Sequence, residues 1–168
     1  PVTPGSRDFI KSPEEAKRVA AEVGYPVLLK AAAGGGGKGI RQVKEPGEMA
    51  DAFSLAQNEA RLDFGNDQMY LEKVLTNVKH IEVQVIRDSF GSCVYFPERD
   101  CSLQRRKQKV IEESPCELIS EREREKLGQI AVRAAEAADY LNTGTIEFLM
   151  DQDHNFYFME MNTRLQVE

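Results

Sequence analysis

The sequence predicts an α+β fold. Two stretches that open with helix-capping residues carry apolar residues at helical spacing, and most of the remaining chain alternates polar and apolar residues as strands do. At 168 residues the chain fits one domain, or two small lobes that share a cleft. With 41% hydrophobic and 30% charged residues it can bury a core, which argues against disorder.

Composition and termini exclude several classes of protein. The net charge of −6 argues against non-specific nucleic-acid binding. No apolar run approaches membrane-spanning length, and the N-terminus lacks a signal-peptide pattern. The cysteines Cys93, Cys101 and Cys116 form no CxxC pair, so we expect reduced packing residues in a cytoplasmic protein rather than disulfides or zinc ligands. Because the chain starts at Pro1 without methionine and stops inside a polar-patterned strand, we expect a fragment of a longer protein.

The first 75 residues alternate helices and strands. Ser12-Pro13-Glu14-Glu15 is a capping box with proline at the first helical position, and the helix it opens ends at Gly24. The elements that follow are a short buried strand 25–30, a strand 40–43, an amphipathic helix 47–62 and a strand 69–75.

From residue 80 the pattern is mostly that of strands. Residues 80–87 alternate in polarity, and the turn 88–91 leads to a strand near 93–97, which predicts a hairpin. A charged stretch, 98–109, follows. A second capping box at Ser120 opens a helix, and we take the charged residues between Glu112 and Arg124 as solvated helix surface. Strands at 143–150 and 156–161 close the chain.

The last stretch, 156–168, has an unusual polar face. If it is extended, successive side chains point to opposite faces. One face then holds Glu160, Asn162, Arg164, Gln166 and Glu168. The other holds Met159, Met161, Thr163, Leu165 and Val167. A solvated strand face is one interpretation. The carboxylate, amide and guanidinium groups favour a site for a cation beside an oxyanion.

The closing hairpin offers a metal site in one of two registers. If the hairpin centres between Asp153 and His154, Glu147 and Glu160 lie opposite each other and repel unless a cation joins them. With Asn162 they would form an all-oxygen set suited to Mg²⁺. A register one residue different would put one glutamate outside, and the sequence leaves both registers open.

The glycine run 34–39 suits phosphate binding. It satisfies GxGxxG, but a strand rather than a helix follows, and Gly39 stands where a Walker A loop needs serine or threonine. A flexible hairpin tip is the plain alternative. Because Lys30 and Lys38 bracket the loop, we favour a strand–loop–strand flap that closes over a triphosphate.

A basic stretch contains Arg105, Arg106, Lys107 and Lys109. It is a solvated face or a contact for a nucleotide or small anion, and it is too short and mixed for a nucleic-acid patch. His80 alone would be an ordinary surface or hydrogen-bonded histidine.

Seven motifs, spread over essentially the whole chain, carry a resemblance to a known family. They are PVTPGS at Pro1, YPVLLKAAAGGGGKGI at Tyr25, LEKVL at Leu71, HIEVQV at His80, ERDCSLQRRKQKVIEESP at Glu98, GTIEFL at Gly144 and FMEMNTRLQVE at Phe158. Together they resemble the biotin carboxylase component of biotin-dependent carboxylases, which are ATP-grasp enzymes. The segments ERDCSLQRR and EMNTRLQVE are highly specific, whereas the glycine loop alone would not be.

The resemblance implies two lobes around a nucleotide cleft, a lid of residues 1–75 and an antiparallel-sheet core of residues 76–168. The implied nucleotide-binding residues are Lys30, Gly36 and Gly37 for the phosphates, Glu72, Lys73, Val74 and Leu75 for the adenine, and His80, Gln104 and Lys107 near the nucleotide or its reaction partner. Lys107 stands where many members have histidine and others asparagine.

The resemblance also implies the reaction centre. The metal ligands would be Glu147, Glu160 and Asn162, which bind Mg²⁺ or Mn²⁺. Lys109, Arg164 and the Val167 backbone would hold bicarbonate, and Glu168 would be the general base. Arg164 nearby would keep that base deprotonated.

The activity that the resemblance implies is ATP-dependent carboxylation of biotin. Bicarbonate would attack the γ-phosphate of ATP to give carboxyphosphate, whose breakdown carboxylates biotin on a carrier protein. A carboxyltransferase component would use the product, and the parent would be a homodimer. The family has a further N-terminal domain and a C-terminal part that this chain lacks. Another ATP-grasp ligase, such as a carbamoyl-phosphate-synthetase-like enzyme, and a non-catalytic nucleotide-binding module are the alternatives.

Overall fold

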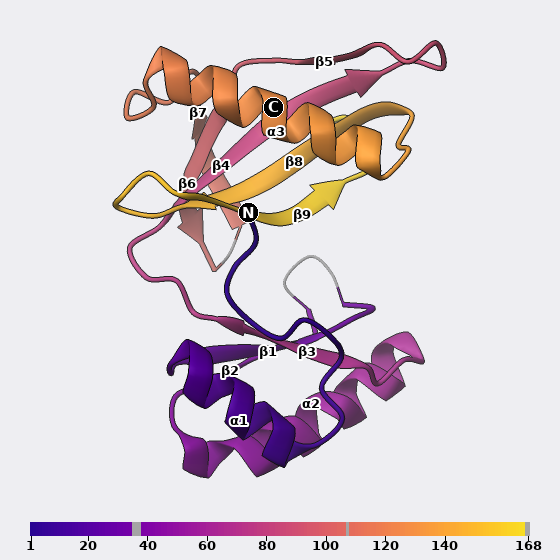
Figure 1. Cartoon of the computed structure of the whole chain (residues 1–168), viewed down its shortest axis with the longest axis vertical. Coiled ribbons are helices and arrows are strands. Elements are labelled where there is room, and N and C mark those ends of the chain that lie inside the picture. Colours follow the sequence, from indigo (N-terminus) through magenta and orange to yellow (C-terminus); the bar gives the residue numbers. More distant parts are fainter. Residues whose placement is uncertain (35–37, 107, 167–168) are drawn as a thin grey trace. The chain divides into compact units, whose positions relative to one another are not determined.

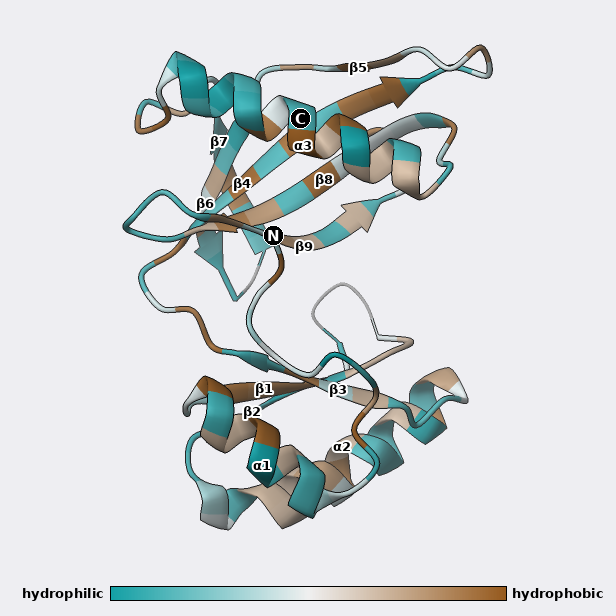
Figure 2. Cartoon of the chain, viewed as in Figure 1, coloured by the Kyte–Doolittle hydropathy of each residue, from teal (hydrophilic) through white to brown (hydrophobic). Residues whose placement is uncertain are grey.

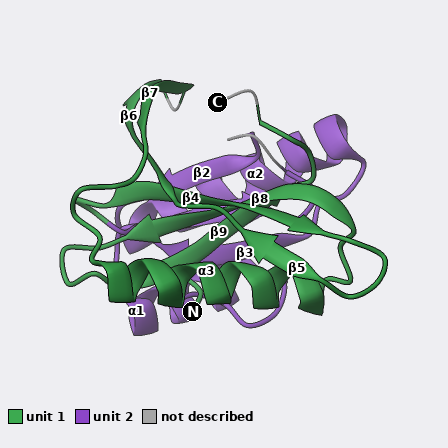
Figure 3. Cartoon of the chain, turned by 90° about the horizontal axis from the view of Figure 1, so that it is seen from above, with its two compact units in different colours: residues 1–2, 76–168 green, residues 3–75 purple. Residues whose placement is uncertain are grey.

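The computed structural model describes residues 1–34, 38–106 and 108–166. It divides into two compact units, residues 3–75 and residues 1–2 with 76–168 (Figure 3). They differ from the predicted division into 1–75 and 76–168 in residues 1–2, because Val2 forms a parallel bridge with Phe158. Helices and antiparallel sheets occur in both units, so the predicted α+β class is confirmed. The lid and core roles stay predictions.

The unit of residues 3–75 is a three-stranded antiparallel sheet with two α-helices (Figure 1). The strand order is β2-β1-β3. The elements are α1 (Pro13–Val23), β1 (Val27–Ala31), β2 (Ile40–Val43), the 3₁₀ helix η1 (Pro46–Glu48), α2 (Met49–Phe64) and β3 (Met69–Lys73).

Buried and partly buried residues alternate along β1, so one face of the strand belongs to the core. Val27, Leu29 and Ala31 are buried in one cluster with residues of both helices, among them Ala16 of α1 and Phe53 of α2. Burying such side chains contributes about 1.5–3 kcal/mol for each large aliphatic or aromatic group, so these helices hold the sheet.

The helix ends are close to those predicted. The Ser12 hydroxyl accepts from the Glu15 backbone N–H at 3.2 Å, but the Glu15 carboxylate accepts from the Lys11 N–H, so only half of the predicted capping box forms. Gly24 follows the last residue of α1 with φ of 83°. Helix α2 begins and ends two residues later than predicted, and Gly65 stops it in the left-handed conformation.

The second unit is a six-stranded antiparallel sheet with one α-helix among its described residues. The strand order is β7-β6-β4-β8-β9, with β5 paired to β4. The elements are β4 (Lys79–Arg87), β5 (Cys93–Tyr95), β6 (Arg99–Arg105), β7 (Gln108–Glu113), α3 (Glu121–Ala137), β8 (Asn142–Met150) and β9 (Phe156–Asn162). The predicted hairpin of β4 and β5 and the second capping box, Ser120 with Glu123, are confirmed.

The two faces of this sheet differ in chemistry. Figure 2 shows hydrophobic and hydrophilic residues alternating along β4 and β8. Ile81 and Val83 pack with Phe148 against Leu127 and Ala131 of α3. The opposite face is polar, and four of its polar residues are buried, namely Glu82, Gln84, Thr145 and Glu147. Buried polar groups require partners, so this face is where a site would be built.

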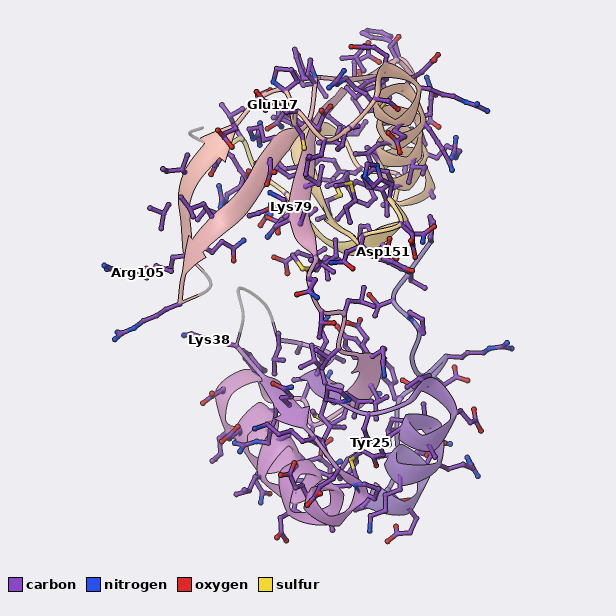
Figure 4. The ribbon with its side chains drawn as sticks, turned by 90° about the vertical axis from the view of Figure 1, so that its left-hand side faces the viewer. Tyr25, Lys38, Lys79, Arg105, Glu117 and Asp151 are labelled. Atoms are coloured by element: carbon purple, nitrogen blue, oxygen red, sulfur yellow. The ribbon has the colours of Figure 1, made fainter. Side chains whose placement is uncertain are left out.

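The prediction that the charged residues between Glu112 and Arg124 are solvated helix surface holds only in part. Glu112 and Glu113 belong to the β6–β7 hairpin and Glu117 lies before α3, whereas Glu121 and Arg122 are exposed on α3. Irregular pairing between Asp100 and Gln104 breaks the two-residue period that identifies strands. Arg105 extends into solvent near the tip of this hairpin (Figure 4).

The predicted extension of the last strand to residue 168 is wrong for residues 163–166. Strand β9 ends at Asn162, and Leu165, expected on an apolar face, is 68% exposed. The alternation of polar residues continues past Asn162 into irregular backbone, where it does not predict which side chains share a face. Val167 and Glu168 lie outside the described residues.

All three cysteines are free, as predicted, and Cys101 and Cys116 are buried. Within the described residues, no helix is long and apolar enough to cross a membrane.

Candidate functional site

A row of charged residues crosses four strands on the polar face of the larger sheet. Arg99 of β6 is the Cα partner of Glu82 on β4, Glu82 is the partner of Glu147 on β8, and Glu147 is the partner of Glu160 on β9. Cα partners in antiparallel strands share a face. The predicted pairing of Glu147 with Glu160 is therefore confirmed, although the residues nearer the turn follow the other register.

A β-bulge in β9 brings Glu160 opposite Glu147. Nearer the turn Phe148 pairs with Phe158, and a register shift separates this pair from Glu147 and Glu160. Met159 is the additional residue that brings the second glutamate into line. Bulges re-aim side chains in this way and often lie beside functional sites.

Lys109 bridges two carboxylates of the row. Its Nζ donates to Glu147 Oε1 at 2.9 Å and also to Glu82 Oε2. Glu82 is fully buried and Glu147 is 4% exposed. Burial lowers the pKa of the Lys109 ammonium, but the hydrogen bonds that it donates to these two carboxylates outweigh burial and hold the pKa above its usual value. Lys109 is thus held as a cation at the centre of the row.

Glu147 gathers three donors. Besides Lys109, its carboxylate accepts from His80 Nε2 at 2.8 Å and from Asn162 Nδ2 at 2.7 Å. Burial raises the pKa of Glu147, but the hydrogen bonds from His80 and Lys109 overcome it and lower the pKa to about 2. The carboxylate is therefore ionised at neutral pH.

Gln104 sets the tautomer of His80. The Gln104 Nε2 donates to the Cys101 carbonyl at 2.9 Å and lies 2.7 Å from His80 Nδ1. The bond to the carbonyl identifies this atom as the amide nitrogen, so Nδ1 must accept and Nε2 carries the proton that points to Glu147. The two predicted nucleotide-side residues thus contact each other and orient the Glu147 carboxylate.

The donors on this face fit a hard divalent cation. Glu147 and Glu160 are adjacent carboxylates, and Asn162 adds an amide. Within the described part of the chain, Glu160 has no hydrogen-bond or ion-pair partner. Carboxylate and amide oxygens are what Mg²⁺ takes from proteins. The carboxylates outnumber the cations in the row, which an added cation would correct.

The segment after β9 joins this site through one arginine. Arg99 Nη2 donates to Gln166 Oε1 at 2.9 Å, and Gln166 is 6% exposed. Arg164 is exposed, and its guanidinium donates to the neighbouring Leu165 carbonyl at 3.3 Å. Of the residues predicted to bind bicarbonate and phosphates, Val167, Glu168, Lys107, Gly36 and Gly37 lie outside the described residues.

In the other unit, Lys30 lies on the face of β1 away from the core. Its Nζ is 3.0 Å from Glu72 Oε2 and 5.2 Å from the Tyr70 ring centroid, and both partners belong to β3. Burial lowers the pKa of Lys30, but the Glu72 carboxylate raises it by more, so the pKa lies above its usual value. Two of the predicted nucleotide residues, Lys30 and Glu72, therefore meet as a partly buried ion pair.

Part of the strand that is predicted to bind adenine already forms hydrogen bonds with other residues of the protein. Lys73 Nζ donates to the carbonyls of Gly24 and Tyr25 at 2.7 and 3.1 Å. The N–H groups of Lys73 and Val74 bond to the Pro4 and Pro26 carbonyls. A ligand at this strand would therefore use carbonyl groups or Leu75.

The glycine loop connects antiparallel strands, as the flap prediction requires. Gly39 has φ of +71°, and a Cβ there would lie 2.9 Å from the Ala31 Cβ. Glycine is thus needed where the loop enters β2. Lys38, labelled in Figure 4, is exposed beside it.

Sequence reasoning missed Glu82 and Arg99 as members of the site, and it placed Gln166 on the polar face without predicting its bond to Arg99. Glu82 lies on the same face of its strand as His80, so the alternation of HIEVQV could have identified it. Arg99 and Gln166 depend on strand register and on irregular backbone, which alternation does not reveal.

A groove of about 770 Å³ lies apart from this row. It is lined by Lys79, Asp100 and Cys116, among others, and by Glu117, which Figure 4 labels with Lys79. Asp100 pairs with Ile81, so the groove borders the α3 side of the sheet. None of the carboxylates of the row contributes to it.

Comparisons with known proteins identify the family of the chain and its relatives. The family model described as carbamoyl-phosphate synthase L chain, ATP binding domain, matches residues 1–168. The chain is 53% identical along its whole length to the biotin carboxylase, chloroplastic, of Arabidopsis thaliana and to the biotin carboxylase of Halalkalibacterium halodurans, and covers 31% and 37% of them.

Two solved structures are similar throughout the chain. A biotin carboxylase complex from Campylobacter jejuni gives a TM-score of 0.95 at 54% identity, and the chain covers 38% of it. The biotin carboxylase domain of 2-oxoglutarate carboxylase from Hydrogenobacter thermophilus gives a TM-score of 0.93 at 49% identity, with 37% covered. The chain thus spans about a third of these relatives, and the predicted ATP-grasp fold is confirmed. Because the family model matches from the first residue to the last, the chain belongs to the family of the carbamoyl-phosphate synthase L chain, ATP binding domain.

Proposed function

We propose that the chain is the central ATP-binding part of a biotin carboxylase, which uses ATP and bicarbonate to carboxylate biotin on a carrier protein. The observation that carries the proposal is the row Glu82–Glu147–Glu160 with Lys109 bridging its first two members. Joining two anions, ATP and bicarbonate, requires cations held in fixed positions beside metal-binding carboxylates. The similarity to biotin carboxylases over the whole chain favours this substrate pair.

Glu147, Glu160 and Asn162 would hold the metal ion. A bound Mg²⁺ supplies positive charge that offsets the charge developing on the transferred phosphoryl group. The related domain of Hydrogenobacter thermophilus was solved with MgADP and bicarbonate, which supports Mg²⁺ here, with Mn²⁺ as a further candidate. His80 and Lys109 orient the Glu147 carboxylate for this task.

Lys109 and Arg164, with the Val167 backbone, would bind bicarbonate. An ammonium group has three donors, and Lys109 uses two on carboxylates, which leaves one for an anion. Arg164 is exposed and offers most of its guanidinium. Glu168 would take the proton of bicarbonate, whose oxygen then attacks the γ-phosphorus. The bond from that phosphorus to the β–γ bridging oxygen breaks, ADP leaves, and carboxyphosphate forms.

The remaining predicted residues would bind the nucleotide. Lys30 with the backbone of Gly36 and Gly37 would hold the phosphates, and the strand from Glu72 through Lys73 and Val74 to Leu75 would receive the adenine. His80, Gln104 and Lys107 would contact the nucleotide or its reaction partner. Because Lys30 already pairs with Glu72, a phosphate would either replace the Glu72 carboxylate at the Lys30 ammonium or bind beside it.

Partners follow from the same assignment. Carboxyphosphate breaks down to phosphate and the carboxyl group that biotin receives, so a biotin carboxyl carrier protein and a carboxyltransferase component are expected. A homodimer is expected as well, and the Hydrogenobacter thermophilus domain is described as a dimer. The cytoplasmic location stays a prediction, since some relatives are named chloroplastic.

A second candidate is a carbamoyl-phosphate-synthetase-like ligase, which the description of the matching family favours. Both reactions begin with bicarbonate and ATP, and they differ in the acceptor. Free biotin stimulates bicarbonate-dependent ATP cleavage in the first case, and an ammonia donor does so in the second. A non-catalytic nucleotide-binding module would bind ATP without cleaving it.

The test uses the protein at its full encoded length. Wild-type protein should cleave ATP in a bicarbonate-dependent manner that biotin stimulates. Arg164→Ala should abolish carboxylation while ATP affinity, measured by titration calorimetry, stays nearly unchanged. Arg133→Ala, an exposed arginine on α3, is the matched control and should behave as wild type. Equal loss of ATP binding and carboxylation in Arg164→Ala would contradict the role given to Arg164.

A further inference from the structure

The segment that follows β9 has few attachments. Residues 163–166, which include Arg164, lie outside regular structure. Among the described residues, the only side-chain hydrogen bond that ties this segment to the sheet is the one from Arg99 Nη2 to Gln166 Oε1, at 2.9 Å. Gln166 is 6% exposed although the three residues before it, Thr163, Arg164 and Leu165, are exposed. The glutamine is therefore the anchor of the segment.

Arg99 also controls the other side of the site. Its guanidinium, 13% exposed, lies 2.5 Å from Glu82 Oε1 and 3.6 Å from Glu112 Oε2. The second oxygen of Glu82 accepts from Lys109. Arg99 thus binds Glu82, which accepts from Lys109, and Gln166, which fixes the segment of Arg164. In the part of the chain that the structure describes, Arg99 forms no hydrogen bond with Lys109 or Arg164 themselves.

We propose that Arg99 is a positioning residue for the bicarbonate-binding cations. Through Glu82 it orients Lys109, and through Gln166 it fixes the segment that carries Arg164. The inference rests on the proposed function, which assigns bicarbonate to those two cations. A planar guanidinium can bind two acceptors in fixed directions, whereas a lysine supplies the charge without the geometry.

The charge balance gives the direction of the effect. Without the two-sided binding of Glu82 and Gln166 by the Arg99 guanidinium, Lys109 is the main counter-charge of the fully buried Glu82. Lys109 is therefore drawn toward Glu82. The segment with Arg164 loses its anchor in the same step. Both changes weaken the binding of a small anion, while Lys30 and Glu72, in the other unit, are untouched.

The test compares Arg99→Lys with Arg124→Lys in the protein at its full encoded length. Arg124 is the matched control, since its side chain is 15% exposed and binds Glu98, which is 1% exposed. Arg99→Lys should raise the KM for bicarbonate by about tenfold, the scale of one charge-assisted hydrogen bond, and leave the KM for ATP unchanged. Hydrogen exchange of residues 163–166 should accelerate. Arg124→Lys should alter neither quantity.

Gln166→Met provides a second, independent variant. It removes the acceptor, keeps the side-chain length and leaves the Glu82 pair intact. It should also accelerate exchange in residues 163–166 and raise the KM for bicarbonate. The double variant with Arg99→Lys should show less than the summed effect, because both changes break the same bond.

The outcomes separate the two proposals. If wild-type protein shows no bicarbonate-dependent ATP cleavage, the proposed function fails, and the positioning role fails with it. If wild-type activity is present but the KM for bicarbonate is unchanged in both variants, the role of Arg99 fails alone. Should Arg99→Lys not fold, Gln166→Met decides.

Discussion

Two buried glutamates of the larger unit are held in different ways. Glu98 is 1% exposed, and Arg124 Nε lies 3.0 and 2.8 Å from its two oxygens. The Cys116 N–H donates to the same carboxylate at 3.1 Å. Glu147 is similarly buried, but it shares Lys109 with Glu82 and faces a third carboxylate, Glu160, on the next strand.

The difference separates scaffold from site. Arg124 binds both oxygens of the buried Glu98 through its Nε and reaches the exposed Glu121 through its Nη1, and the bond to Glu98 ties the beginning of β6 to the first turn of α3. Around Glu147 the carboxylates outnumber the cations, and Glu160 has no partner among the described residues. A protein that keeps such an imbalance needs an added cation, whereas a closed pair needs nothing more.

The largest expected effect concerns the closed pair. Arg124→Met should lower the free energy of unfolding by about 3–5 kcal/mol, because it leaves Glu98 buried without a counter-charge. Urea denaturation at neutral pH measures this. Arg122→Met, an exposed neighbour on α3, is the control and should change little. The specific activity of the folded Arg124→Met protein should equal that of wild type, and a large loss there would break the contrast between scaffold and site.

Acid should reveal the charge held at Glu147. Hydrogen bonds lower its pKa in the folded protein from 4.5 to about 2, so its contribution to stability is present above about pH 4.5 and is lost as the pH falls toward 2. At about 1.4 kcal/mol for each pKa unit, the contribution is about 3 kcal/mol at neutral pH. Urea denaturation of wild type and Glu147→Gln should differ by this amount at neutral pH and much less at about pH 3.

The exposed Glu117→Gln is the control for the acid series. Its difference from wild type should be small at every pH. A difference between Glu147→Gln and wild type that persists unchanged in acid would mean that Glu147 acts through packing rather than charge.

The sequence predicted one of these regions better than the other. The sequence offered the pairing of Glu147 with Glu160 as one of two registers, because strand period and turn position alone do not reveal the bulge in β9 that brings Glu160 into line. The pairing of Glu98 with Arg124 could not be predicted, since it joins a strand to a helix across 26 residues. No periodicity links residues in elements of different kinds.

The site itself was predicted only in part, for a related reason. Lys109 and His80 were assigned from the resemblance, but their contacts with Glu147 depend on the irregular β6–β7 pairing and on the fold of three neighbouring strands. Arg99 was not predicted because Glu98, Arg99 and Asp100 are all charged, so the beginning of β6 shows no alternation of apolar and polar residues.

A smaller effect tests the excess of carboxylates. In Glu160→Gln, the Mg²⁺-dependent part of ATP affinity should fall by about tenfold to a hundredfold, the range seen for weakened metal sites. Because Glu160 has no partner among the described residues, its stability should match wild type. Titration calorimetry with and without Mg²⁺ measures the affinity, with Glu117→Gln as the exposed control. Unchanged affinity would count against the metal assignment.

The smallest expected effect lies at the start of α3, on the scaffold side. The Ser120 hydroxyl accepts from the Glu123 N–H, and the Glu123 carboxylate accepts from the Ser120 N–H at 2.9 Å. Hydrogen bonds from the Ser120 hydroxyl and N–H lower the pKa of Glu123 to about 2. Ser120→Ala removes one half of the box and should lower the free energy of unfolding by about 1 kcal/mol. ATP affinity and the KM for bicarbonate should stay as in wild type, because α3 packs on the face of the sheet opposite the carboxylate row. A change in either would show that the scaffold side is coupled to the site.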